Sequence, residues 1–211
     1  MKRVLIVAGI HGDEPSGSHA ALSILLDPAL KKKIARTGIA LDVVPLANPS
    51  GMIRTTRKTI GGHDMNRYFS DKPQKNEPLE CMALRNFLKN AHRTYDLLLS
   101  LHEDPEFKTF YLYDFGHGRF SQTIQSIFTL IKKHRIGLYT GLDDPDPVLN
   151  NFVIHGYVNM THNDPAPMFE DYLVRHKKAK RVLTLEVPGK LPLVKKVELA
   201  LELVKSVLGS L

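Results

Sequence analysis

The chain of 211 residues is 43% hydrophobic and 24% charged, which is typical of a globular domain and excludes intrinsic disorder, collagen and a coiled coil. Its formal net charge is +7, but the Lys and Arg clusters are scattered without an aromatic-basic nucleic-acid motif, so we interpret them as solvated helix faces and do not expect nucleic acid as a partner. The longest apolar runs fall far short of the ~20 residues that span a bilayer, and the single Cys81 excludes an internal disulfide and a cysteine-based metal site.

The N-terminus combines Met-Lys-Arg with an apolar run, a pattern that resembles the start of a signal peptide. This run is short, however, and leads directly into His-Gly-Asp-Glu without a small-residue cleavage site. We therefore expect residues 3–8 to be the first strand of a cytoplasmic protein that does not cross a membrane.

Strand-like apolar runs then alternate with helix-like periodic ones. We expect strands over residues 3–8, 40–47, 96–101, 109–113 and 181–187, and helices over residues 17–26 (ended by Asp27-Pro28), 77–93, 120–133 and 193–208. The run 96–101 is dominated by leucine, as expected for a strand buried on both faces. This alternation predicts the α/β class: a single domain over residues 1–211, in which helices cover both sides of a largely parallel sheet.

Two segments lack a convincing periodicity. Residues 48–76 form a stretch of 29 residues without predicted structure, which is uncommon inside a compact domain unless the segment is functional. Residues 143–167 are also irregular and rich in Asp, Asn and Pro. We expect both segments to border a site.

Polar residues gather at the ends of the predicted strands, where open parallel sheets bind ligands. The first strand leads to His11 and Glu14, the strand 96–101 leads to His102, and the last strand carries Glu186 near its end. Two histidines and a carboxylate are a ligand set of catalytic zinc, which leaves a position open for water. A further carboxylate beside that water can act as a general base.

Each of these residues also has a structural alternative. A His-x-x-Glu spacing arises by chance in many proteins, His102 suits a core or loop histidine, and Glu186 suits a helix cap or a salt bridge. Their arrival at one edge of the sheet, with a loop rich in Arg and Asn between them, favours the metal site.

Six motifs occur in the order found in zinc carboxypeptidases. They are Gly9-Ile10-His11-Gly12-Asp13-Glu14, Asn48-Pro49-Ser50-Gly51, Thr56-Arg57, Asp64-Met65-Asn66-Arg67, Ser100-Leu101-His102 and Thr184-Leu185-Glu186-Val187-Pro188. The chain resembles this family over positions 1 to about 190, and it is most similar to the short bacterial branch that includes the murein peptide amidases. The resemblance implies an α/β/α sandwich with a mixed, largely parallel sheet of the zinc-carboxypeptidase (phosphorylase/hydrolase-like) type.

The resemblance also implies a role for each residue of the metal site. His11, Glu14 and His102 would bind Zn²⁺, and Glu186 would take a proton from the zinc-bound water and pass it to the leaving amine. Asp64 would accept a hydrogen bond from His11 and fix the tautomer of its ring.

Three further residues would act on the substrate. Arg57 would stabilise the oxyanion that develops on the carbonyl, while Asn66 and Arg67 would hold the terminal carboxylate, Arg67 through a bidentate fork. The structural alternative for both arginines is a surface salt bridge.

The sequence departs from the family pattern in several places. Tyr68 follows Asn66-Arg67 where the peptidases usually have another Asn, and Glu103-Asp104 after His102 adds negative charge beside the metal.

No motif locates the family's mobile tyrosine. Tyr157 is our candidate for this substrate-binding residue and Tyr172 is the other. The specificity pocket should involve residues 170–172, where Asp171 would attract a cationic group of the substrate unless this segment is the start of a solvated helix.

Three functions fit the resemblance. The first is a zinc metallocarboxypeptidase or peptide amidase that hydrolyses an amide bond next to a free carboxylate in a small peptide. The second is an N-acyl amino acid deacylase of the sister branch, succinylglutamate desuccinylase and aspartoacylase, which uses the same zinc ligands. We favour the peptidase because of Gly51, the nine-residue step from Arg57 to Asn66, and the mere 25 residues after Glu186. The third, a non-catalytic binding homologue, conflicts with the presence of every ligand and of the base. The oligomeric state is open.

Overall fold

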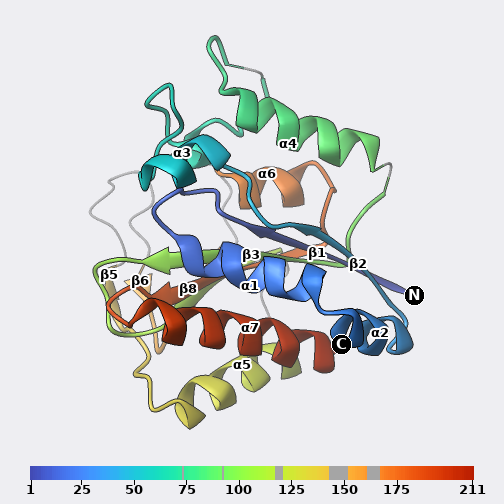
Figure 1. Cartoon of the computed structure of the whole chain (residues 1–211), viewed down its shortest axis with the longest axis vertical. Helices are drawn as coiled ribbons and strands as arrows, with labels where there is room; N and C mark the ends of the chain where they lie inside the picture. The colour runs from blue at the N-terminus through green and yellow to red at the C-terminus, as the bar shows by residue number, and fades with distance from the viewer. Residues whose placement is uncertain (73, 92, 117–120, 143–151, 161–166) are drawn as a thin grey trace.

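The computed structural model describes residues 1–72, 74–91, 93–116, 121–142, 152–160 and 167–211 (Figure 1). Its elements follow the chain in the order β1 (Lys2–Ala8), α1 (Pro15–Leu26), α2 (Pro28–Arg36), β2 (Ile39–Val44), α3 (Pro49–Arg54), the 3-10 helix η1 (Met65–Arg67), α4 (Leu79–Asn90), β3 (Leu97–Asp104), β4 (Tyr111–Gly116), α5 (Gln122–Lys133), β5 (Gly141–Leu142), β6 (Phe152–Val153), β7 (Tyr157–Met160), α6 (Phe169–Arg175), β8 (Arg181–Pro188) and α7 (Leu193–Gly209). Within these described residues, no helix combines the length and the apolarity needed to cross a membrane.

The main sheet has six strands in the order β2-β1-β3-β8-β4-β7. The first four are mutually parallel, whereas β4 runs antiparallel to β8 and carries β7 parallel to itself. The predicted mixed, largely parallel sheet is therefore confirmed. Because β1, β3 and β8 are parallel neighbours, the residues that end these strands meet at one edge of the sheet.

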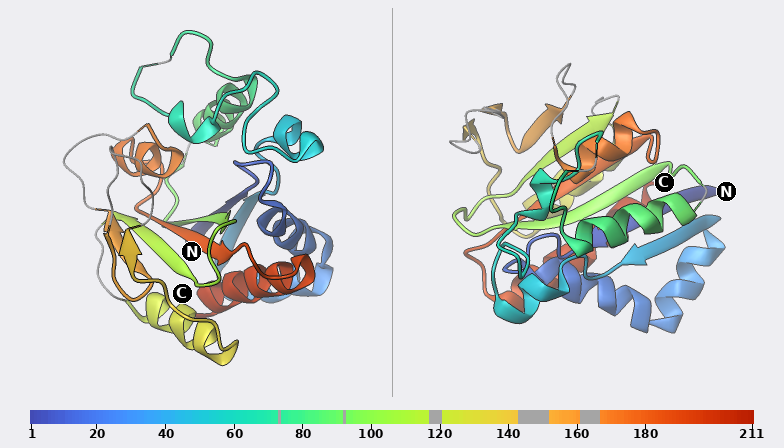
Figure 2. Two further views of the ribbon diagram at one scale, coloured as in Figure 1. Left: turned by 90° about the vertical axis from the view of Figure 1, so that its left-hand side faces the viewer. Right: turned by 90° about the horizontal axis from the view of Figure 1, so that it is seen from above.

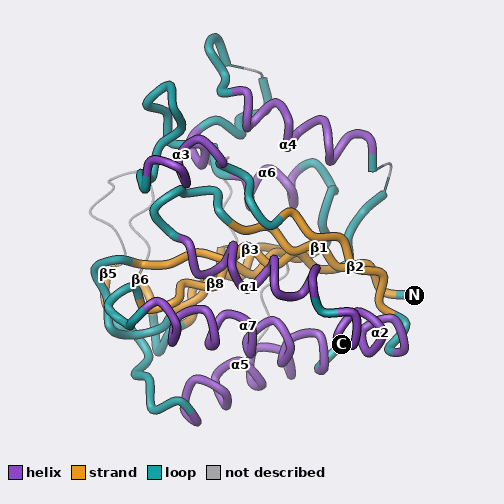
Figure 3. The backbone as a smooth tube through the Cα atoms, in the orientation of Figure 1, coloured by secondary structure: helices purple, strands orange, loops and turns teal. Residues whose placement is uncertain are grey.

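Helices cover both faces of this sheet, as three directions of view show (Figures 1, 2 and 3). On one face, α1, α5 and α7 contribute apolar residues such as Ile24, Ile127 and Leu203 to a single core. On the other face, α4 and α6 contribute Leu84 and Phe169 to a second core. Strand side chains alternate between the two cores, as the two-residue period of a strand requires, and the three-layer α/β/α arrangement is confirmed.

Local sequence signals explain where α1 ends and α2 begins. Asp27 accepts a hydrogen bond from the backbone N–H of Leu30 at 3.0 Å, and Pro28 occupies the first turn of α2. Asp at the cap position and Pro at the next are the favoured start of a helix. The first helix ends before Asp27-Pro28 as predicted, but a second helix, α2, begins there, which was not predicted from the sequence.

The long segment 48–76 contains regular structure that the sequence prediction lacked. Asn48 Oδ1 accepts the N–H of Gly51 at 2.8 Å and caps α3, which has only six residues. The segment also contains η1, which Asp64 caps by accepting the N–H of Asn66 at 2.9 Å. Both helices are too short to produce a hydrophobic period, so their caps determine where they begin.

Candidate metal centre and active site

The end of β1 approaches α3 so closely that only glycine fits between them. A Cβ atom on Gly12 would lie 2.0 Å from the carbonyl carbon of Gly51. Asn48, fully buried, donates from Nδ2 to the carbonyl oxygen of Ile10 at 3.2 Å and ties the same two segments together. These contacts fix the turn that carries His11. They also explain by packing why glycine occurs at Gly12 and Gly51, in two of the six motifs.

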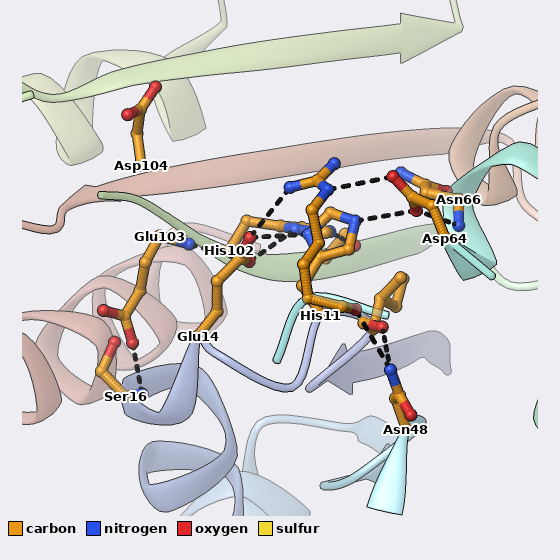
Figure 4. A network of polar contacts seen from close by, with 12 residues as sticks. His11, Glu14, Ser16, Asn48, Asp64, Asn66, His102, Glu103 and Asp104 are labelled. Atoms are coloured by element: carbon orange, nitrogen blue, oxygen red, sulfur yellow. Dashed lines mark hydrogen bonds and ion pairs between the residues drawn. The ribbon is translucent and has the colours of Figure 1, made fainter. Parts of the chain in front are cut away.

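A buried cluster of potential metal ligands lies at the carboxyl edge of the sheet. His11 follows β1, Glu14 directly precedes α1 and His102 belongs to β3, and one potential ligand atom of each lies within 4.8 Å of the others. The Nδ1 atoms of His11 and His102 lie 2.6 and 2.9 Å from the two carboxylate oxygens of Glu14. Figure 4 shows the three side chains pointing toward one another.

The outer edges of both imidazole rings face acceptor groups. His11 Nε2 lies 3.3 Å from Asp64 Oδ1, and His102 Nε2 lies 3.1 Å from Ser100 Oγ and 3.3 Å from Glu170 Oε1. A histidine that binds a metal through Nδ1 keeps its proton on Nε2. Ser100 and Glu170 can accept that proton from His102. Nε2 of His11 is buried at ion-pair distance from Asp64 but forms no hydrogen bond to any described residue. The donor set and its surroundings therefore fit a divalent metal ion bound between His11, Glu14 and His102.

The cluster is strongly polarised by its own charges. Burial alone would raise the pKa of Glu14, but the charges of His11 and His102 outweigh it and hold the pKa of this carboxyl below its ordinary value. Burial alone would lower the pKa of His102, but Glu14 above all, then Glu170 and Glu186, raises that pKa well above its ordinary value. A metal ion bound to the two Nδ1 atoms and to Glu14 would take the place of the protons that these groups bind in its absence.

Glu186 lies directly beside this cluster. In the parallel pairing of β3 with β8, Glu186 is the register partner of His102, so both side chains project to the same face of the sheet. Both also line a cavity of about 310 Å³. The cavity is bounded by His11, Glu14, Arg57, Asn66, Arg67, His102, Glu103, Asp104, Pro105, Glu106, Phe107, Tyr111, Tyr113, Met168, Thr184 and Glu186.

Arg57 reaches the cavity from the loop after α3. Its Nε donates to Asp64 Oδ2 at 2.9 Å, and its terminal nitrogen lies 3.6 Å from Glu14 Oε1. Burial alone would lower the pKa of Arg57, but Asp64, Glu14 and Glu186 raise it above its ordinary value. A permanent positive charge thus lies beside the predicted ligand and base carboxylates.

Asn66 and Arg67 of η1 line the same cavity. Asn66 is buried, and both ends of its amide bind α6: Oδ1 accepts the N–H of Phe169 at 2.7 Å, and Nδ2 donates to Glu170 Oε2 at 3.1 Å. Arg67 donates to the carbonyl oxygen of Asn66 at 3.1 Å. The structure therefore brings together eight of the predicted site residues: His11, Glu14, Arg57, Asp64, Asn66, Arg67, His102 and Glu186.

The remaining two predicted residues lie elsewhere, and their assigned roles stay predictions. Tyr157 donates from its hydroxyl to Asp114 Oδ2 at 2.9 Å, and Asp171 accepts from Arg175 Nε at 2.6 Å within α6. Neither is among the described residues that line the cavity. Two other tyrosines do line it, Tyr111 and Tyr113 of β4.

Tyr111 lies in the predicted strand 109–113, on the same face as Tyr113, but no sequence signal marked either tyrosine as a site residue. It is the register partner of Glu186 across β4 and β8, and its hydroxyl donates to Asp104 Oδ2 at 2.6 Å. Three buried or half-buried residues have contacts near the ligands that the sequence did not predict: Glu103 binds Ser16 and Lys196, and Glu170 lies beside His102.

The six-stranded sheet, the helices on both of its faces and the ligand cluster at its carboxyl edge form a carboxypeptidase-like fold with a candidate metal site. The family model of the succinylglutamate desuccinylase/aspartoacylase catalytic domain matches residues 1–196, and the chain therefore belongs to this family. The resemblance predicted from the motifs is confirmed, with the matching model coming from the branch treated as the alternative. No curated protein matches the chain.

Solved structures support the same fold. A candidate metallopeptidase from Shewanella amazonensis has a TM-score of 0.79 and 24% identity, over 98% of this chain and 76% of that one. A metallo-carboxypeptidase from Burkholderia cenocepacia has a TM-score of 0.64 and 18% identity, over 99% and 56%. A succinylglutamate desuccinylase from a Silicibacter species has a TM-score of 0.60 and 16% identity, over 98% and 56%.

Proposed function

We propose that this protein is a metal-dependent hydrolase that cleaves the amide bond next to a free carboxylate in a short peptide. The observation that carries this proposal is the convergence of the ligand cluster, Glu186, Arg57 and Arg67 in one cavity. This is the set of groups that metal-assisted amide hydrolysis requires.

His11, Glu14 and His102 would hold the metal, and zinc is the first choice because two imidazoles and one carboxylate are a common ligand set of catalytic zinc. When bound, such an ion supplies a Lewis acid that polarises the scissile carbonyl and makes water a stronger acid.

The chain's own groups would carry the proton and the charge. A carboxylate oxygen of Glu186 would accept a proton from the attacking water and then donate it to the nitrogen of the leaving amine. The guanidinium of Arg57, held by Asp64, would donate hydrogen bonds to the oxyanion. Arg67 and the turn that contains Asn66 would bind the carboxylate of the released amino acid, which would align the bond for attack.

The charges around the cavity favour a peptide with a free amino group. Asp104 and Glu106 line the cavity, where a positively charged ammonium group would be attracted and a second carboxylate would be repelled. An acidic acyl group such as succinyl therefore suits this cavity poorly.

A second candidate is the deacylation of an N-acyl amino acid whose acyl group is uncharged. Membership of the desuccinylase/aspartoacylase family favours it. The bond broken is the same, since an N-acyl amino acid also has its amide next to a free carboxylate, and the two candidates differ only in what lies on the acyl side.

A mass-spectrometric assay of zinc-loaded protein would separate these candidates. The substrates would be dipeptides and a murein tripeptide with free or amidated carboxyl ends, and N-acetyl and N-succinyl amino acids with a free carboxylate. We expect release of a C-terminal residue only from peptides with free carboxyl ends, and slower cleavage of the N-acyl amino acids. Preferential cleavage of the N-acetyl amino acids would move the protein to the second candidate, and no cleavage by metal-loaded protein would refute both.

Two variants would control this assay. Glu186→Gln removes the proposed base and should abolish cleavage. Glu198→Gln makes the same chemical change at an exposed position of α7 and should leave the activity unchanged.

A further inference from the structure

Glu170 is a buried carboxylate that the proposed mechanism does not use. It lies in the first turn of α6, is 0% exposed, and is not among the described residues that line the cavity. The sequence places residues 170–172 near the specificity pocket, but a residue at this depth cannot touch a substrate. Burying an unpaired carboxylate is costly, so its position calls for an explanation through the groups that it binds.

One oxygen of Glu170 faces the metal ligand His102. Glu170 Oε1 accepts the hydroxyl of Ser100 at 2.6 Å and lies 3.3 Å from His102 Nε2. Ser100 Oγ itself lies 3.1 Å from the same nitrogen. Glu170 and Ser100 therefore hold the edge of the ring opposite Nδ1, the atom that faces Glu14.

The other oxygen faces the loop that we assign to the substrate carboxylate. Glu170 Oε2 accepts from Asn66 Nδ2 at 3.1 Å, while the N–H of the preceding Phe169 binds Asn66 Oδ1 at 2.7 Å. The amide of Asn66 is thus clamped at both ends to the first turn of α6. This clamp fixes η1, from which Arg67 extends to the cavity.

We propose that Glu170 is a positioning residue that orients His102 for the metal and η1 for the substrate carboxylate at the same time. Its two oxygens belong to one planar group, so a displacement at either partner is passed to the other. The part of this inference that concerns the substrate rests on the proposed function, whereas the part that concerns the metal does not.

Three substitutions separate the two connections of Glu170. Glu170→Gln leaves one acceptor oxygen in place of two, so it can satisfy either the side of His102 or the side of Asn66. Ser100→Ala weakens only the connection to His102, and Asn66→Ala removes only the connection to η1. Glu77→Gln is the matched control, because Glu77 is also a buried carboxylate, with 7% of its side chain exposed, but pairs with Arg85.

The readouts are the Kd for Zn²⁺ from chelator competition, the visible spectrum of the Co²⁺-loaded protein, and KM and kcat for a cleaved peptide. We expect Glu170→Gln to weaken Zn²⁺ binding by about 10–100-fold, as changes behind a metal ligand do, and to alter the Co²⁺ bands. We also expect it to raise KM by about tenfold, the effect of losing one hydrogen bond to a charged group. Ser100→Ala should change only the metal readouts, and Asn66→Ala chiefly KM.

The outcomes keep the two proposals apart. A wild-type Zn²⁺ Kd and Co²⁺ spectrum in Glu170→Gln, or a wild-type protein that binds no metal, overturns the positioning role. If Glu170→Gln does not fold, Ser100→Ala decides, because unchanged metal binding in that variant overturns the same role. If the metal readouts change as expected but no peptide is cleaved, the positioning of His102 holds and the proposed function fails.

Discussion

The charge of Lys196 should be essential for stability although it lies outside the proposed chemistry. Lys196 of α7 pairs with Glu103 at the end of β3, with 13% and 3% of the two side chains exposed. Glu103 also accepts the N–H of Ser16 at 2.5 Å, which supplies α1 with the cap that Glu14 does not provide, and donates its own N–H to Glu14 at 3.1 Å. We therefore predict that Lys196→Met destabilises the fold around the ligand cluster.

The magnitude follows from the burial of the remaining partner. Removing one member of a buried ion pair costs about 3–5 kcal/mol, because the other charge stays buried without compensation. For a domain of this size, 1 kcal/mol corresponds to roughly 2–4 °C in Tm, so Lys196→Met should lower Tm by roughly 6–20 °C. In Lys196→Met/Glu103→Gln the buried charge is gone, and the amide oxygen can still accept from Ser16. The double variant should therefore be more stable than Lys196→Met alone.

Urea unfolding and calorimetry on chelator-treated protein would measure these differences without a contribution from bound metal. Lys195→Met is the control, because its side chain is exposed one position earlier on the same helix. A fall in stability no larger than that of Lys195→Met would refute the argument. The single variant Glu103→Gln completes the comparison. If the double variant loses as much free energy of unfolding as Lys196→Met and Glu103→Gln lose together, the two charges do not interact and the argument also fails.

Three further predictions concern the site and the second core. Glu186→Gln should bind Zn²⁺ with wild-type affinity but lose about 10²–10⁴-fold in kcat, and activity near wild type would remove Glu186 from its role as base. Arg67→Ala should raise KM for substrates with a free carboxylate and leave kcat nearly unchanged, and an equal effect on amidated substrates would contradict the assignment. Burial raises the pKa of the Cys81 thiol to about 12, so alkylation by iodoacetamide at pH 8 should be very slow until urea unfolds the protein, and rapid labelling of the native chain would contradict its burial.

The sheet and its carboxyl edge could be predicted because the strands are strong local signals. The run 96–101 is dominated by leucine, and most of it belongs to the central strand β3, between β1 and β8. Once three parallel strands are placed, the chain direction alone brings His11, His102 and Glu186 to one edge. The metal cluster is thus mainly a consequence of topology.

Short helices and long-range side-chain contacts could not be predicted in this way. α3 and η1 are maintained by caps and tertiary contacts, and α6 has only seven residues. Asp171 and Glu170 are neighbours in α6, yet one pairs with Arg175 and the other lies under His102. Adjacent positions on a helix differ by about 100° in direction, so the identity of the residues cannot tell which one faces the site.

The alternation of side chains along β3 decides where the two acids after His102 direct their charge. The sequence predicts that Glu103 and Asp104 add negative charge beside the metal. In β3, however, Ser100 and His102 face the second core, while Leu101 packs in the first. Glu103 continues that alternation toward α1 and α7, where Ser16 and Lys196 bind its carboxylate. Asp104 accepts the hydroxyl of Tyr111. The charge of Glu103 is therefore balanced by Lys196, and its carboxylate serves to hold the helix that follows Glu14.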